Sequence, residues 1–340
     1  DRRKSPSAER FPGEMYPVVS FWPSYPSCSA GYTVFPKLIP NSNFFPSEAN
    51  TAGPCNSPPE PFRTLNLQDP LRTRVLMESR LSFCPTASRC LAITCLAVIF
   101  SSAETSKAPG DWGGLVVCGK ATNNQPGGFA TLEGSYGAHH GGSDDADNSG
   151  IIKYVRLEYA GFPILTDKEI NSLTMGSVGS GTIISHVQAS YGLDDAFEWF
   201  GGTVNCDHLV AFKTTDDDFD CDFGYRGRVQ FAVSFRSANL ADPVSGSNSF
   251  EVDNDGGGST NTPFTAPSFS NVSVFGPKQD STTSIDANFR RAMHLRRSNK
   301  IKIYNSFFTG YPQGVVIDGG NTRTYAESDE LVIKNSVLSL

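Results

Sequence analysis

The sequence GTIISHVQASYGLDDAFEWFGG (residues 181–202) is followed by TVNCDHLVAFKTTDDDFDCDFGYRG (203–227), and the second stretch repeats the first. The two align at an offset of 22 residues, with four matches: Val187 on Leu209, Asp194-Asp195 on Asp216-Asp217, Phe197 on Phe219 and Glu198 on Asp220. Such a repeat, with β-branched residues and glycine corners in place of helical spacing, is typical of a β-solenoid whose turns stack over a shared core. We therefore predict an all-β fold, a right-handed parallel β-helix with long loop insertions.

The composition divides the chain. Residues 1–110 hold 15 of the 22 prolines but only 4 of the 32 glycines. Because no periodicity of 2.0 or 3.6 residues persists there, we expect residues 1–90 to form an irregular Pro-rich segment, either an extended arm or a gene-model artefact. Residues 91–340 are predicted to form the β-helix domain. The chain stops at Leu340 directly after a strand-like run, so we expect a C-terminal cap or further domain to be missing.

The apolar run CLAITCLAVIF (90–100) has two interpretations. Together with the basic residues before it and the SSA after it, the run resembles a signal peptide. Alternatively, LAVIFSS is a buried strand that feeds the coil, which is the interpretation we favour. Because the run is too short to cross a bilayer, no transmembrane span is predicted.

Short β-rich runs recur from Asp111 onward, and insertions rich in Gly, Ser, Asp and Asn separate them at 121–148, 162–180, 237–266 and 277–299. A small or polar residue precedes the apolar strand in several runs. We expect these residues to lie at turns between sheets, where their side chains stack from turn to turn: Tyr154, His186, His208, Asn271, Asn305 and Asn335. Trp199, Cys206 and Cys221 are predicted to be core residues, with no disulfide between the two cysteines.

The net charge of −7 argues against nucleic acid as a partner, because phosphate binding needs clustered Lys and Arg. The eight cysteines include no CxxC pair and none has a histidine at zinc-ligand spacing, which argues against a structural zinc site. His139 and His140 are expected in an exposed loop. An acidic surface suits cations or neutral sugars, and simple solubility is the alternative.

The sequence DDDFDCDF (216–223) concentrates the acidic charge. Since side chains alternate along a strand, Phe219, Cys221 and Phe223 are predicted to point inward, and Asp218, Asp220 and Asp222 outward to solvent. Glu198 should then lie beside Asp220 on the neighbouring turn. A row of like charges is relieved either by protonation or by a bound cation.

Calcium fits such a row because it takes six to eight oxygen ligands in flexible geometry. Asp/Asn/Gly-rich loops elsewhere supply similar oxygens, although none is an EF-hand. The predicted metal ligands are Asp194, Glu198, Asp216, Asp218, Asp220, Asp222, Asp144, Asp145, Asp147, Asp253 and Asp255. A solvated acidic face and a set of catalytic carboxylates are the alternatives.

Several stretches resemble a known family: DWGGLVVCGKA, GGSDDADNSGIIKYVRLEYAG, the repeat at 179–205 and SGSNSFEVDNDGG. The family comprises secreted bacterial proteins, common in Bacteroidetes and described as hypothetical proteins or lipoproteins, that are predicted to form right-handed parallel β-helices. The resemblance covers about Leu96 to Leu340. It implies an extracellular or cell-surface location, and it carries no established activity or catalytic residue.

The sequence therefore favours a calcium-stabilised β-helix that binds carbohydrate, a polysaccharide or cell-surface glycan, through its acidic face. A polysaccharide lyase or glycoside hydrolase using the same carboxylates is one alternative, and no catalytic residue is assigned. In a lyase, Arg226 or Arg228 would serve as base, although a salt bridge is the expected role of both. A structural adhesin or filament subunit that assembles through strand edges is the other alternative.

Overall fold

The computed structural model describes residues 95–132, 139–165 and 168–339, together with the backbone of three short earlier strands. These three are β1 (Val18–Phe21), β2 (Phe35–Pro36) and β3 (Thr73–Arg80). β1 pairs in parallel with the first coil strand of one sheet, and β3 pairs antiparallel with the first coil strand of the other. The remainder of the Pro-rich segment expected at 1–90 lies outside the described residues.

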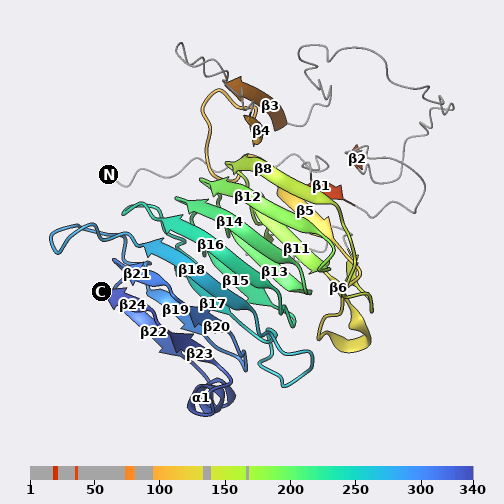
Figure 1. Cartoon of the computed structure of the whole chain (residues 1–340). Coiled ribbons are helices and arrows are strands. Elements are labelled where there is room, and N and C mark those ends of the chain that lie inside the picture. The colour runs from red at the N-terminus through yellow and green to blue at the C-terminus, as the bar shows by residue number, and fades with distance from the viewer. Residues whose placement is uncertain are drawn as a thin grey trace, which may run out of the picture.

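The main body is a parallel β-helix built from two long sheets (Figure 1). Each turn of the coil contributes to both sheets. Sheet A contains β5 (Gly114–Cys118), β11 (Leu173–Val178), β13 (Phe197–Gly202), β15 (Phe219–Asp222), β17 (Phe250–Val252), β19 (Arg291–Leu295) and β22 (Gln313–Ile317). Sheet B contains β4 (Cys95–Ser102), β8 (Ile151–Glu158), β12 (Ile183–Ser190), β14 (Asn205–Phe212), β16 (Arg228–Phe235), β18 (Ser268–Phe275), β20 (Lys302–Tyr304) with β21 (Phe307–Thr309), and β23 (Val332–Lys334) with β24 (Val337–Ser339).

The 22-residue repeat is confirmed as strand register. Phe197 pairs with Phe219 in sheet A, and Val187 pairs with Leu209 in sheet B. The interpretation of LAVIFSS as a coil strand is also confirmed, because β4 pairs in parallel with β8.

In sheet B, from β8 onward, one residue in each turn of the coil interrupts the strand, and the strand bends there. The bend residues adopt left-handed backbone angles, with φ between 50° and 59°: Tyr154, His186, His208, Phe231, Asn271, Asn305 and Asn335. The register skips these residues, as between Ser185–Asp207 and Val187–Leu209. The predicted stack is confirmed, since the rings of His186 and His208 lie 4.2 Å apart at an interplanar angle of 10°. The predicted position between sheets is wrong, because this corner lies within the strands of sheet B.

Asn305 provides a test of this corner. It is exposed and has φ 50°, a conformation that asparagine tolerates and that β-branched residues strongly disfavour. Asn305→Val should lower the free energy of unfolding by about 1–2 kcal/mol in urea denaturation. Asn305→Gly should have a much smaller effect, and equal losses for the two variants would contradict the conformational explanation.

The core is a continuous stack of side chains between the sheets. Phe197, Trp199 and Phe219 are fully buried there, with the Phe197 and Phe219 rings stacked at 6.0 Å. Cys206 and Cys221 are buried free thiols, as predicted.

The predicted bounds of three insertions are too wide, because each of these insertions contains a coil strand: β11 lies within 162–180, β17 within 237–266 and β19 within 277–299. Their short periodic segments are hidden by flanking Gly, Ser and Asn residues. The first two insertions also contain the 3-10 turn η1 (Pro126–Gly128) and two hairpins, β6 (Phe129–Thr131) with β7 (His139–Gly141) and β9 (Pro163–Leu165) with β10 (Lys168–Glu169). The helix α1 (Gly320–Glu327) lies outside the predicted insertions, between β22 and β23.

The insertions also cover one end of the outer face of sheet A. Leu132 and Ile170 pack there with Val116 and Phe200 in a small hydrophobic cluster. His140 is buried against Phe200, so the prediction that it lies in an exposed loop is wrong. Burial lowers the pKa of His140 to about 4. Within the described part of the chain, no helix is long and apolar enough to cross a membrane.

Candidate functional site

The outer face of sheet A carries two adjoining rows of polar side chains. One row lies in the strands, where Glu198 pairs with Asp220 and Asp220 with Glu251. The other lies in the turns that enter the same strands, where Asp195 and Asp217 each precede their strand by two residues. We call the five residues Asp195, Glu198, Asp217, Asp220 and Glu251 the acidic ladder.

Backbone hydrogen bonds align the turn row. The N–H of Asp217 donates to Asp195 Oδ1 at 2.8 Å, and the N–H of Asn248 donates to Asp217 Oδ1 on the next turn. Asn171 and Asn248 also precede their strands by two residues, so asparagines stand at both ends of the turn row and the two aspartates occupy its centre. The side-chain amide of Asn171 donates to Glu198 of the strand row.

The carboxylates of the ladder converge closely enough to share cations. One oxygen each from Asp195, Glu198 and Asp220 lie within 4.8 Å of one another, and the same holds for Asp217, Asp220 and Glu251. A third group of the same dimensions joins Asp195 to Asp194, which precedes it in the same turn, and to Asp216 of the next turn.

Burial and mutual repulsion raise the pKa of the central carboxyls. The pKa of Asp220 is well above its ordinary value because the group is desolvated and faces Glu198 and Glu251. Desolvation and the Asp194 and Asp220 charges raise the pKa of Asp195 in the same way. For Asp217, burial and Glu251 raise the pKa to about 7.

Arginines neutralise one edge of this face. Burial alone would raise the pKa of Glu251, but the hydrogen bond from His294 and the charge of Arg296 outweigh it and hold the pKa low. Arg296 also pairs with Asp253 at 2.8 Å, and Arg297 pairs with Asp253 at 2.6 Å.

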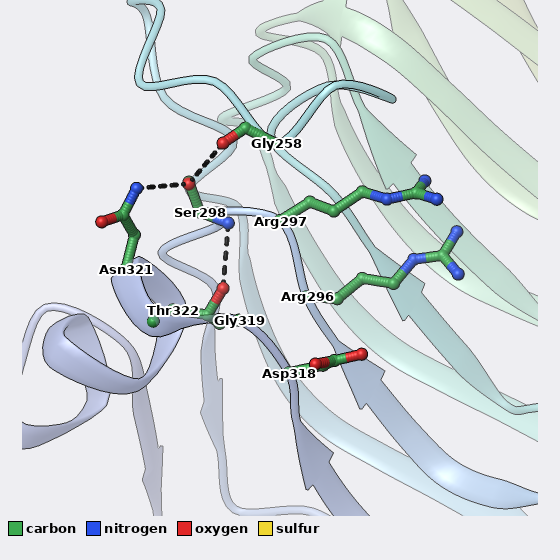
Figure 2. A pocket seen from close by; sticks show the side chains of 9 residues that line it. Gly258, Arg296, Arg297, Ser298, Asp318, Gly319, Asn321 and Thr322 are labelled. Carbon is green, nitrogen blue, oxygen red and sulfur yellow. Dashed lines mark hydrogen bonds between the residues drawn. The ribbon is translucent and has the colours of Figure 1, made fainter.

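A pocket of about 310 Å³ adjoins that arginine edge, between α1 and the end of β19. Figure 2 shows the Arg296 and Arg297 side chains extending side by side, with Asp318 beside them. The other wall is held by hydrogen bonds from Ser298 Oγ to the Gly258 carbonyl and from Asn321 Nδ2 to Ser298 Oγ.

The prediction that Asp218 points outward with Asp220 and Asp222 is wrong. Asp218 is fully buried inside the coil and lies 3.1 Å from Arg236 Nε, with Ser234 Oγ donating to its second oxygen. It precedes β15 rather than belonging to it, so strand alternation does not govern it. Phe223 has φ 52° and packs outside the coil against Phe200, so its predicted inward position is also wrong.

The other predicted ligands are divided between this face and the loops. Asp222 lies on the same face as Asp220, and burial and the charge of Asp253 raise its pKa. Asp255 accepts backbone N–H groups of its own loop, from Gly257 and Ser259.

The loop aspartates at 144–147 lie between β7 and β8 and contact the turn that follows β11, where the N–H of Ser180 donates to the Asp145 carbonyl. Asp144 accepts the N–H of Ala146, and Asp147 accepts the hydroxyl of Ser149. Asp145 pairs with Arg226 at 2.6 Å, which confirms the salt bridge expected for that arginine.

Asp195, Asp217 and Glu251 were absent from the predicted ligands. For the first two, the signal was the 22-residue offset itself, which superimposes Asp195 on Asp217. Glu251 follows the same phase as Glu198 and Asp220, but the long insertion before it conceals the repeat.

The chemistry of the acidic ladder fits calcium. Its ligands are all oxygens, and the largest influences on the pKa of Asp195 and of Asp220, which are burial and neighbouring carboxylates, all raise it. Asp216 Oδ1, which belongs to the adjoining carboxylate group, is buried without a hydrogen-bond partner. An orphaned buried carboxylate oxygen is costly unless a cation or proton compensates it.

Comparison with known proteins agrees with the architecture. The family described as pectate-lyase-like beta helix domain matches residues 94–339, which include the acidic ladder. No curated protein and no solved structure matches the chain significantly. Because the family match covers most of the chain and the coil it describes is the one observed, the chain belongs to the family of pectate-lyase-like β-helix domains.

Proposed function

We propose that the protein binds Ca²⁺ through the acidic ladder and uses the same face of sheet A to bind carbohydrate outside the cytoplasm, at the cell surface or in the extracellular space. The observation that carries the proposal is the convergence of one oxygen each from Asp195, Glu198 and Asp220 within 4.8 Å, where burial and neighbouring carboxylates raise the pKa of Asp195 and Asp220. Membership of a pectate-lyase-like family supports carbohydrate as the partner.

The ladder residues have distinct tasks in this proposal. Asp195 and Glu198 would hold the ion together with Asp220, and bound Ca²⁺ would neutralise the face and supply coordination positions for sugar hydroxyl or carboxylate oxygens. The insertion cluster around Phe200 closes one end of the face, and Arg296 and Arg297 supply positive charge at the other. Such an arrangement orients an oxygen-rich ligand along the sheet.

Elimination from a uronate polymer is the second candidate, because arginines and carboxylates share this face. A lyase needs a base that can lose its proton. Burial disfavours the charged form of Arg296, but its bonds to Asp253 and Glu251 prevail and raise its pKa, which keeps it protonated. Arg226 is engaged by Asp145. Binding is therefore favoured over turnover.

Calorimetric titration with CaCl₂ tests the metal step. Asp220→Asn should weaken Ca²⁺ binding at least tenfold, because it removes the carboxylate shared by two of the three-residue groups. Asp329→Asn makes the same charge change at an exposed residue on another part of the coil and should leave the affinity unchanged. Equal affinities for Asp220→Asn and the unaltered protein would refute the proposed site.

Glycan-array binding with and without EGTA tests the carbohydrate step. We expect the protein to bind glycan, and we expect EGTA and Asp220→Asn each to abolish that binding. No ultraviolet-absorbing unsaturated products should form. Release of such products from uronate polymers would instead establish the lyase. If no glycan binds while calcium does, the carbohydrate proposal fails and the metal site stands.

A further inference from the structure

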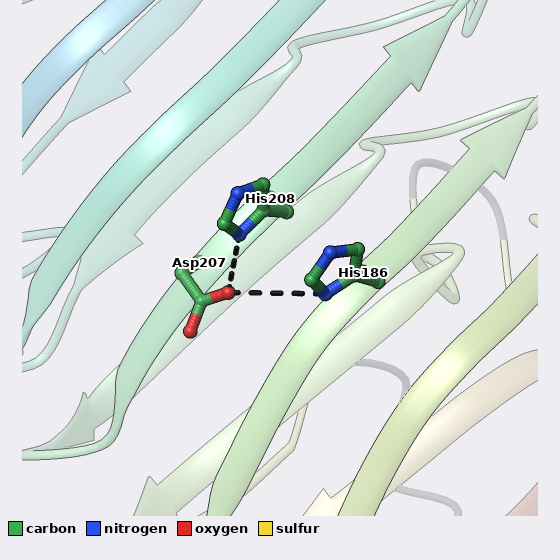
Figure 3. Close-up of side chains that lie close together, drawn as sticks. All are labelled: His186, Asp207 and His208. Atoms are coloured by element: carbon green, nitrogen blue, oxygen red, sulfur yellow. Dashed lines mark hydrogen bonds and ion pairs between the residues drawn. The ribbon is translucent and has the colours of Figure 1, made fainter.

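The corner of sheet B brings two histidines and an aspartate together on the surface, on the sheet that lies across the core from the acidic ladder. Asp207 and His208 lie on β14, and His186 lies on the adjacent strand β12. Figure 3 shows the Nδ1 atoms of both imidazoles directed toward one oxygen of Asp207. The distances from Asp207 Oδ1 are 2.6 Å to His208 Nδ1 and 4.0 Å to His186 Nδ1.

From this arrangement we propose that His186, Asp207 and His208 form a surface binding site for a divalent transition-metal ion such as Zn²⁺. One potential ligand atom from each residue lies within 4.8 Å of the others. Two imidazoles and a carboxylate are the donors that Zn²⁺, Ni²⁺ and Cu²⁺ prefer, whereas Ca²⁺ prefers oxygen alone. The site is thus chemically distinct from the acidic ladder.

The fold brings the donors together before any metal binds. The left-handed bend residue of each turn presents its side chain at the corner, so successive turns stack one imidazole on the next. Tyr154 packs on His186 with ring centroids 4.7 Å apart, and Phe231 packs on His208 at 5.1 Å. The imidazoles are the middle pair of a column of four rings, which restricts their movement along the coil axis.

Ser185 completes the arrangement from the side. Its hydroxyl lies 2.6 Å from Asp207 Oδ1 and 2.7 Å from His186 Nδ1, so it orients both donors.

The site is open to solvent. The side chains of His186, Asp207 and His208 are 41%, 47% and 48% exposed. Two Zn–N bonds of about 2.0–2.1 Å at a tetrahedral angle place their nitrogens about 3.4 Å apart. The rings are stacked 10° from parallel, so both must tilt until the ion lies in each ring plane. Three protein ligands then leave a coordination position for water or for a donor from another molecule.

The sequence supplies substitutions suited to the corner. Asn271, Asn305 and Asn335 occupy the equivalent position on later turns with φ between 50° and 58°. His186→Asn and His208→Asn therefore remove an imidazole while keeping a residue that the same backbone conformation accepts. His139→Asn is the matched control, because His139 is exposed on the β6–β7 hairpin and belongs to none of the three-residue metal groups among the described residues.

The test is calorimetric titration of the full chain, without a histidine tag, with ZnCl₂ in saturating Ca²⁺. We expect Zn²⁺ binding that weakens at least tenfold in His186→Asn and in His208→Asn, that is lost in the double variant, and that His139→Asn leaves unchanged. Melting temperatures measured in chelator check that the variants fold.

Cu²⁺ electron paramagnetic resonance gives a second readout. Hyperfine coupling to imidazole nitrogen should be present in the unaltered protein and absent in the double variant. Zn²⁺ affinity that is unchanged in the folded double variant, or Cu²⁺ spectra without nitrogen coupling in the unaltered protein, would overturn the proposal. Neither result depends on whether the acidic ladder binds calcium.

Discussion

Asp218→Asn is expected to lower the free energy of unfolding by about 3–5 kcal/mol, because it leaves the buried guanidinium of Arg236 without a counter-charge. Both side chains have no exposed surface. Arg236 also donates to the carbonyl oxygens of Thr214 and Asn248 and to the hydroxyl of Tyr311. One arginine therefore ties together successive turns of the coil, and its charge cannot reach water if the partner is lost. Urea denaturation at pH 7 measures the loss.

Asp145→Asn is the control for this effect. It breaks an ion pair of similar length, but Asp145 is 48% exposed, so solvent screens its charge and the expected loss is at most about 1 kcal/mol. A loss for Asp218→Asn as small as that for Asp145→Asn would show that the buried pair is not needed for stability.

Without calcium, the protein should become less stable as the pH rises from about 4 to about 7. The pKa of Asp217 is about 7 in the folded chain because of burial and the nearby charge of Glu251, whereas an unfolded aspartate has a pKa of about 3.9. Between these values the folded chain keeps a proton that the unfolded chain has lost. The stabilisation is therefore complete below about pH 4 and is lost as the pH passes through 7, at up to about 1.4 kcal/mol per pH unit for each retained proton.

Thermal or urea unfolding in EDTA across this pH range measures the slope. Asp217→Asn should flatten it by about one proton, because the amide cannot titrate and asparagine already occupies the equivalent positions at 171 and 248. Ca²⁺ at a hundredfold excess over its dissociation constant should add about 2.7 kcal/mol at pH 7 and much less at pH 4, where protons compete for the same oxygens. A slope that Asp217→Asn leaves unchanged would remove Asp217 as its source.

The repeat could be predicted from the sequence because side chains that the packing requires recur at the same positions 22 residues apart. Phe197 and Phe219 fill the same core layer, and His186 and His208 fill the same corner. The alternation rule also placed Glu198 beside Asp220. These relations depend only on register between adjacent turns, which the 22-residue offset fixes.

Relations across insertions or outside strands could not be predicted in this way. Asp218 is followed by a regular strand, yet it sits in the turn, where the backbone direction and not alternation sends its side chain inward to Arg236. A long loop separates Glu251 from the preceding turn, so the 22-residue spacing is lost in the sequence. In the structure Glu251 still pairs with Asp220 in the register of the repeat. Calcium binding, secretion and self-assembly stay predictions.

The stacking of the turns determines where the coil unfolds first. Each turn of a solenoid contacts only its neighbours, so loosening begins at the two ends and advances one turn at a time. The acidic ladder spans β13, β15 and β17, with β5 and β11 on one side and β19 and β22 on the other. Amide hydrogens of these middle strands should exchange with solvent most slowly, and the carboxylates should keep their spacing while the outermost turns fray.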